Sequence, residues 1–354
     1  MKSTYFLPKA SVLLCSLAVL AISSQAQAIG FKVSGQINRA VMYIDDGTNS
    51  DINHVDNINS DTRIRFVGSQ DLGNGLSVGT VWESQFISNA SSSVGINQND
   101  DGASSFTERK LELYFDGAFG RVWLGQGDGA ANGTSEVDLS GTGVAAYSGN
   151  TDWGGGVTFL DSAGANVVKV GSTLNSFDGL SRNDRIRYDT PKLGPVKLSV
   201  SATNGNAYEF GGTFASQFDM GKVVAAVGYV DTQDRVANPF SQWDGSISFL
   251  HNSGFNVTFS AGSRDPDTGP TADNYFVKVG YKTGKHAISA DYGETSDLAA
   301  LGDTASAWTG AYVYNLYKGV QIYGAVRVFS LDRTSGLPVE DVTAALFGAR
   351  IKFM

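Results

Sequence analysis

The stretch that decides the fold is "DTRIRFVGSQDLGNGL", residues 61–76. Successive side chains of an extended chain point to opposite faces, so Arg63 and Arg65 share one face and Ile64 and Phe66 share the other. A compact turn, "DLGNG", follows, and a second alternating run begins directly after it. The pattern predicts a hairpin with one polar and one apolar face. It leaves open which solvent each face meets.

Alternating segments of this kind recur to the end of the chain. They are joined in turn by short connections such as "NSG" and "TGK" and by long polar ones such as "DTQDRVANPFSQ". Short turns at one end and long loops at the other are typical of a bacterial outer-membrane barrel, and about ten residues suffice for a tilted strand to cross a bilayer. A soluble sandwich is disfavoured, because the consecutive strands lack Greek-key spacing. We predict an all-β fold, a transmembrane antiparallel β-barrel of sixteen strands at 31–44, 62–71, 76–87, 107–117, 120–127, 182–190, 194–203, 208–219, 221–231, 242–252, 254–264, 273–283, 285–294, 305–317, 319–331 and 341–353.

Residues 1–28 have the features of a secretory signal peptide. Two lysines are their only charges, an apolar run too short to span a membrane follows, and Ala26-Gln27-Ala28 gives a small-residue cleavage site. We predict cleavage after Ala28, export, and a single barrel domain over residues 29–354. The only cysteine, Cys15, lies in the signal peptide, so no disulfide is expected to stabilise the exported chain.

Charge and motifs exclude several classes of function. The chain has 26 basic and 35 acidic residues and a net charge of −9 at pH 7, which argues against nucleic acid as a partner. There is no Gly-x-Ser-x-Gly, His-Glu-x-x-His or Gly-Lys-Ser/Thr motif, and the three histidines are isolated from one another. We therefore expect neither an enzyme, an outer-membrane hydrolase included, nor a cofactor.

Five segments resemble the Gram-negative general porin family. They are "VSGQIN" (33–38), "RIRFVGSQDLGNGLSVGTVWESQF" (63–86), "FDGAFGRVWLGQ" (115–126), "RNDRIRYDTPKLGPVKLSVS" (182–201) and "FGARIKF" (347–353). The resemblance implies an outer-membrane homotrimer in contact with lipid and lipopolysaccharide, through which ions and small hydrophilic solutes diffuse passively. It also implies that the third long loop folds into the lumen and narrows it.

Two positions depart from the family pattern. The family commonly has arginine where Gln126 stands, so one expected basic wall residue is missing. It also usually ends on an aromatic residue that assists assembly, whereas Met354 follows Phe353 here.

Porins sieve by charge and width, so charged side chains on the polar strand faces are the candidate site residues. Arg39 falls on the apolar face of its strand and is excluded. The acidic candidates lie in the third long loop, with Asp152 a weaker one. The basic wall candidates are Arg63, Arg65, Lys110, Arg185, Arg187, Arg350 and Lys352, and the acidic ones are Asp128, Glu136 and Asp138.

A calcium loop is the only metal site that the sequence suggests. Asn97, Asn99, Asp101, Gly102 and Glu108 have the spacing of a twelve-residue calcium loop. Flanking helices are missing and Asn/Asp-rich loops match this pattern by chance, so no metal is expected.

Two alternatives to general diffusion stay open. A substrate-selective porin on the same barrel would show saturable block of conductance by one solute. A barrel that acts mainly in surface adhesion or structural anchoring through its acidic loops would show negligible conductance.

Overall fold

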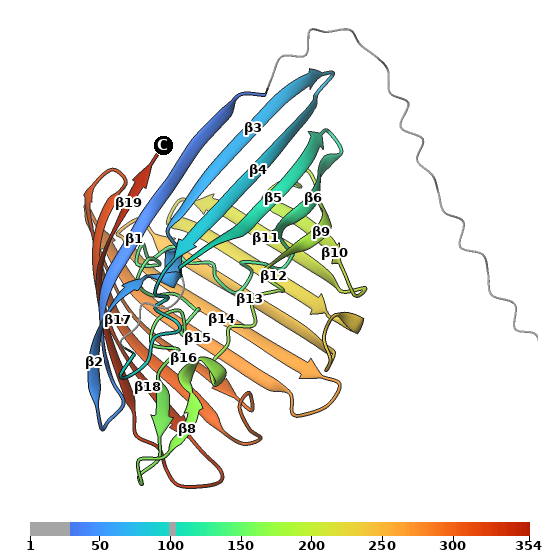
Figure 1. The fold of residues 1–354 in the computed structure, drawn as a ribbon. Helices are drawn as coiled ribbons and strands as arrows, with labels where there is room; N and C mark the ends of the chain where they lie inside the picture. The colour runs from blue at the N-terminus through green and yellow to red at the C-terminus, as the bar shows by residue number, and fades with distance from the viewer. Residues whose placement is uncertain (1–28, 99–103) are drawn as a thin grey trace, which may run out of the picture.

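The computed structural model describes residues 29–98 and 104–354, which form a closed antiparallel barrel (Figure 1). Strand β1 pairs with β19 on one side and with both β2 and β3 on the other, which closes the ring. Because β2 and β3 follow each other along the same partner, they are the two halves of one interrupted wall strand. The seventeen strands of the sheet thus build sixteen positions in the wall, as predicted.

The elements follow the predicted order, with two short strands inside the longest connection. The sheet strands are β1 (Phe31–Asp45), β2 (Ser50–Asp56), β3 (Arg63–Gly73), β4 (Leu76–Ile87), β5 (Ser105–Gly117), β6 (Gly120–Asp128), β9 (Arg182–Asp189), β10 (Val196–Thr203), β11 (Tyr208–Phe218), β12 (Gly221–Asp231), β13 (Phe240–His251), β14 (Phe255–Pro266), β15 (Ala272–Thr283), β16 (His286–Ser296), β17 (Thr304–Tyr317), β18 (Val320–Asp332) and β19 (Val342–Phe353). The remaining elements are the hairpin β7 (Thr158–Leu160) and β8 (Asn166–Lys169) and the 3-10 turns η1 (Ile58–Ser60), η2 (Val170–Ser172) and η3 (Gln233–Arg235).

The two faces of the wall differ in the way the alternation predicts. In β15, Tyr275 and Val277 are exposed outside, while the alternate residues Phe276 and Lys278 are buried inside. An apolar outer face and a polar inner face suit a barrel in lipid, and closure leaves no strand edge unpaired. Arg39 lies on the outer face with Ile37 and Val41, so its exclusion from the inner wall agrees with the structure.

The compact turn "DLGNG" (71–75) is built from residues in the left-handed backbone region. Gly73, Asn74 and Gly75 have φ values of 83°, 53° and 74°, a region that glycine and asparagine enter most readily. This turn lies at the short-turn end of the barrel, the same end at which the chain terminates after β19 (Figure 1).

The second wall strand is interrupted, which the sequence did not predict. Residues 45–60, expected to be a loop, contain β2, because Ile52 and His54 alternate with Asn53 and Val55 along the ladder to β1. The strand breaks at η1, where the side-chain amides of Gln36 and Asn38 each donate to the Ser60 carbonyl at 2.9 Å.

Segment 129–181 runs against the polar inner faces of distant strands. The backbone N–H groups of Val137 and Leu139 each donate to a serine hydroxyl of β13 at 3.0 Å. Lys278 of β15, whose side chain is fully buried, lies 2.8 Å from the carboxylate of Asp138. Arg327 of β18 donates to the Asn150 carbonyl.

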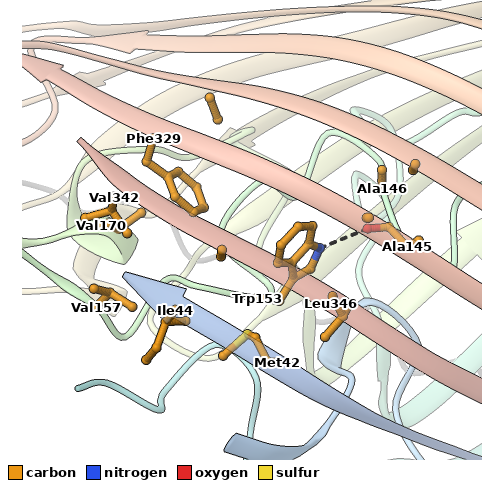
Figure 2. Packing of buried hydrophobic residues seen from close by; sticks show 14 of the residues in the cluster. Met42, Ile44, Ala145, Ala146, Trp153, Val157, Val170, Phe329, Val342 and Leu346 are labelled. Atoms are coloured by element: carbon orange, nitrogen blue, oxygen red, sulfur yellow. Dashed lines mark hydrogen bonds between the residues drawn. The ribbon is translucent and has the colours of Figure 1, made fainter. Parts of the chain in front are cut away.

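One part of this segment packs on apolar side chains of the wall. Trp153 is fully buried among Met42 and Ile44 of β1 and Leu346 of β19, and its indole N–H donates to the Ala145 carbonyl at 2.9 Å (Figure 2). We call this cluster, which also includes Phe159, Val170, Phe329 and Val342, the apolar interior core.

Some predictions fall on residues outside the described ranges. These are the signal peptide and, from the calcium hypothesis, Asn99, Asp101 and Gly102. Across residues 29–98 and 104–354, no helix has the length and apolar character needed to cross a membrane.

Candidate functional site

A cavity of about 680 Å³ lies between segment 129–181 and the wall near η1. The basic and the acidic side chains that line it come from different parts of the chain. Basic side chains come from the wall strands β3, β5 and β9, and most of the acidic ones come from the segment. They are Arg63, Arg109 and Arg182, against Asp61, Glu136, Asp152 and Asp178.

Arg109 is the basic residue of this cavity that pairs with two carboxylates. Strand alternation did not predict that it faces the lumen. Its guanidinium pairs with the carboxylates of Asp61 and of Glu83, the latter at 2.8 Å. A bulge places Glu83 opposite Lys110 and Ser84 opposite Glu108, so Arg109 is the extra residue. The sequence indicates this bulge only through the run Glu108-Arg109-Lys110. Regular alternation would place at least one of three consecutive charged side chains on the lipid-facing side.

Arg63 and Arg182 complete the basic side. Arg63 has no carboxylate oxygen within 4 Å among the described residues, so its charge is the least compensated of the three. Arg182 lies 3.2 Å from the carboxylate of Asp128. Strand alternation does not predict this position for Arg182, because it places Arg182 on the face opposite Arg185 and Arg187.

Opposite these arginines, Glu136, Tyr147 and Asp152 line the same cavity. The Tyr147 hydroxyl donates to the Asp152 carboxylate. Protein surrounds Asp152 and raises the pKa of its carboxyl to about 6, although the hydrogen bond from Tyr147 acts in the opposite direction. Burial raises the pKa of Glu136 well above its usual value, and the charges of Asp178 and Asp152 raise it further.

Asp178 caps a turn at the start of the segment. It accepts from the backbone N–H groups of Gly133, at 2.8 Å, and of Ser135, at 3.1 Å. Burial raises the pKa of its carboxyl, and these hydrogen bonds limit the rise. The three carboxyl groups are therefore set to change charge at higher pH than ordinary carboxylates.

Arg185, a predicted wall residue, lies inside the wall itself. Its side chain is only 2% exposed and pairs with Glu112 of β5. Gly127 makes room for the pair, since a Cβ at that position would lie 2.6 Å from the Arg185 guanidinium. Because Arg185 is buried and its charge is neutralised by Glu112, it presents little free charge to a passing ion.

Lys110, Asp128 and Arg187 are grouped beside this buried pair. Asp128 was predicted in the long loop but is the last residue of β6, where the ladder places it opposite Arg182. It pairs with Lys110. Arg187 lies 2.8 Å from the Asp189 carboxylate and donates to the Gly129 carbonyl at 2.7 Å.

The remaining predicted residues line two neighbouring cavities. Arg350 and Asp138 share a cavity of about 390 Å³ with Glu136, which also lines the larger one. Arg65 and Lys352 line a third, of about 580 Å³, at the short-turn end.

Neither a metal site nor further support for calcium is found in the described ranges. No group of three or more His, Cys, Asp or Glu side chains there could hold a metal ion. Of the calcium hypothesis, Asn97 has a left-handed φ of 60° and Glu108 is exposed on β5.

Solved structures with the same fold cover nearly the whole chain. The anion-selective porin from Comamonas acidovorans aligns with a TM-score of 0.64 and 18% identity, over 92% of this chain and 100% of that one. The outer membrane channel DcaP of Acinetobacter baumannii gives 0.61 and 14% identity, over 93% and 99%. OmpT of Vibrio cholerae gives 0.59 and 12% identity, over 93% and 99%.

At these identities the solved structures establish the fold alone, and no curated protein matches the chain. The family is assigned from a match of the sequence to a family profile. Residues 10–334 match the profile described as Gram-negative porin, which is most of the chain. Together with the closed sixteen-position barrel and its charged interior, this match shows that the chain belongs to the Gram-negative porin family.

Proposed function

We propose that this outer-membrane porin lets ions and small hydrophilic solutes diffuse through a constriction formed at the 680 Å³ cavity. The observation that carries the proposal is the opposition of Arg63, Arg109 and Arg182 to Glu136, Asp152 and Asp178 across one water-accessible space. Opposed charges in a narrow aqueous path create a transverse field, and a permeating solute is sorted by its charge and dipole.

Segment 129–181 is, in this proposal, the element that narrows the lumen. Three contacts support this role: the hydrogen bonds of the Val137 and Leu139 N–H groups to β13, and the ion pair of Asp138 with Lys278. The apolar interior core holds the same segment against β1, β18 and β19. The water path is then displaced toward the arginine-bearing strands β3, β5 and β9.

The direct test is single-channel recording of the purified protein in planar bilayers. We expect steady ohmic steps in KCl, with conductance proportional to salt concentration, because diffusion through a water-filled pore does not saturate. Saturable block by one uncharged solute, such as a sugar, would favour the substrate-selective porin. Absence of conductance from a correctly folded barrel would contradict the proposal and favour an anchoring role.

Ion selectivity should depend on pH. Since the pKa values of Glu136, Asp152 and Asp178 are raised, lowering the pH from 8 to 5 removes negative charge from one side of the constriction. We expect the reversal potential in a KCl gradient to shift toward anions over this range. The double variant Glu136→Gln with Asp152→Asn should flatten the shift, and a wild-type reversal potential constant from pH 8 to 5 would refute the assignment.

We further propose a homotrimer surrounded by outer-membrane lipid and lipopolysaccharide. One of the similar solved structures is described as a trimer form of OmpT. The outer face also carries a polar patch on β1 and β2, where Arg39, 47% exposed, lies 2.6 Å from the Asp56 carboxylate. Hydrocarbon solvates a charged side chain poorly, whereas a neighbouring protomer can supply partners. We also propose that the chain is exported with removal of residues 1–28. Residues 29–354 then form a single barrel domain.

A further inference from the structure

We propose that the cavity of about 580 Å³ at the short-turn end is a binding site for small dianions of the phosphate type. In outer-membrane barrels the short-turn end faces the periplasm, so we call this cavity the periplasmic vestibule. The inference rests on the proposed function, because it assigns a solute class to the same water path.

The vestibule gathers four cationic side chains. Arg63 and Arg65 come from β3, Lys352 from β19 and Lys318 from the turn between β17 and β18. The strand register explains the gathering, since Gln36 of β1 lies opposite both Lys352 and Arg63. Residues from the first and last parts of the chain are thereby brought to one inner surface.

Little negative charge compensates these cations. Glu83 is the one acidic side chain of the lining. One of its oxygens pairs with Arg109 at 2.8 Å, and the other lies 3.8 Å from Arg65. Arg63, Lys318 and Lys352 have no carboxylate side chain within 4 Å among the described residues. Met354, which also lines the cavity, carries the terminal carboxylate, so the four cations exceed the two negative charges by two.

The vestibule continues into the proposed constriction. Arg63 lines both cavities, so an anion in the vestibule lies next to the basic side of the narrow path. Arginine forks match the oxygens of phosphate and lysines add mobile point charges, so the lining favours a compact dianion over chloride. Ser34 and Gln36 add neutral hydrogen-bonding groups to the same wall.

The test measures phosphate binding to the full-length protein in a phosphate-free detergent at pH 8. Broadening of the phosphorus NMR signal of inorganic phosphate gives the Kd for the wild type and for Arg65→Gln with Lys352→Gln. We expect the double variant to bind about tenfold more weakly, because it loses two of four neighbouring cations. The matched control is Lys192→Gln with Lys285→Gln, which removes two exposed turn lysines outside the vestibule.

The inference is overturned if the vestibule double variant binds phosphate as tightly as the wild type. It is also overturned if both double variants lose affinity equally, since general surface charge would then explain the binding. If the vestibule variant does not fold, the sidedness of phosphate block in wild-type channels decides the question. A lower half-blocking concentration from the short-turn side supports the site, and equal values from both sides refute it. A barrel that binds phosphate through these residues but conducts no KCl would refute the proposed function alone.

Discussion

Replacing Trp153 with alanine should release the middle of segment 129–181 from the wall while the barrel itself stays intact. Trp153 is fully buried in the apolar interior core, and the Arg327 guanidinium stacks 4.1 Å from its ring. Truncating a buried tryptophan costs about 3–5 kcal/mol, and this packing energy is lost from the contact between the segment and the wall. The barrel does not depend on this contact, because its strand ladder closes through β1 and β19.

The measurement is single-channel recording combined with hydrogen exchange of residues 142–174. We expect larger and noisier open-channel currents and faster exchange in this segment. Trp308→Ala is the matched control, since Trp308 lies on the outer face of β17 and is 62% exposed. Wild-type currents and exchange in Trp153→Ala would show that the segment is held by its polar contacts alone.

Replacing Arg109 with glutamine should shift the pore strongly toward cations. The variant keeps hydrogen-bonding capacity but removes the charge that compensates Asp61 and Glu83. The negative charges of these two carboxylates are then only partly compensated beside the water path. A unit charge about 4 Å away changes the energy of an ion by about 1 kcal/mol even in water, which corresponds to roughly fivefold in the permeability ratio.

Reversal potentials in a KCl gradient measure this ratio directly. We expect at least that fivefold increase for Arg109→Gln, accompanied by a lower thermal stability because a buried ion pair has lost one partner. Arg333→Gln removes the same charge from the loop before β19 and should leave the ratio unchanged. An unchanged ratio in Arg109→Gln would place the narrowest point elsewhere.

Strand alternation was sufficient to predict the fold, because a barrel in lipid must separate apolar and polar faces along every crossing. It failed where the ladder is irregular. The break at η1 depends on amides of β1, Gln36 and Asn38, that satisfy the backbone of a distant turn. Because no pattern within residues 45–60 indicates that contact, the sequence predicts a loop where the structure has β2.

Strand alternation predicted only some of the charged residues of the lumen. Alternation selected Arg63, Arg350 and Lys352, which do line lumen cavities, but it could not separate them from Arg185, which Glu112 and the space above Gly127 hold inside the wall. Arg109 escaped notice because a bulge changes the face of a side chain without changing local composition. The apolar interior core was also missed, since Met42 and Phe329 occupy inner positions where the pattern predicts polar residues.

The strands that contribute to the apolar interior core imply an order in which the barrel and segment 129–181 assemble. Trp153 meets side chains of β1 near the start of the chain and of β18 and β19 near its end. Its docking surface is therefore complete only when the first and last strands have joined. Contacts between such distant parts of a chain form late, because closing the long intervening loop costs entropy. We expect the nascent barrel to pass through a wide, unobstructed intermediate, in which the pore is open before it becomes selective.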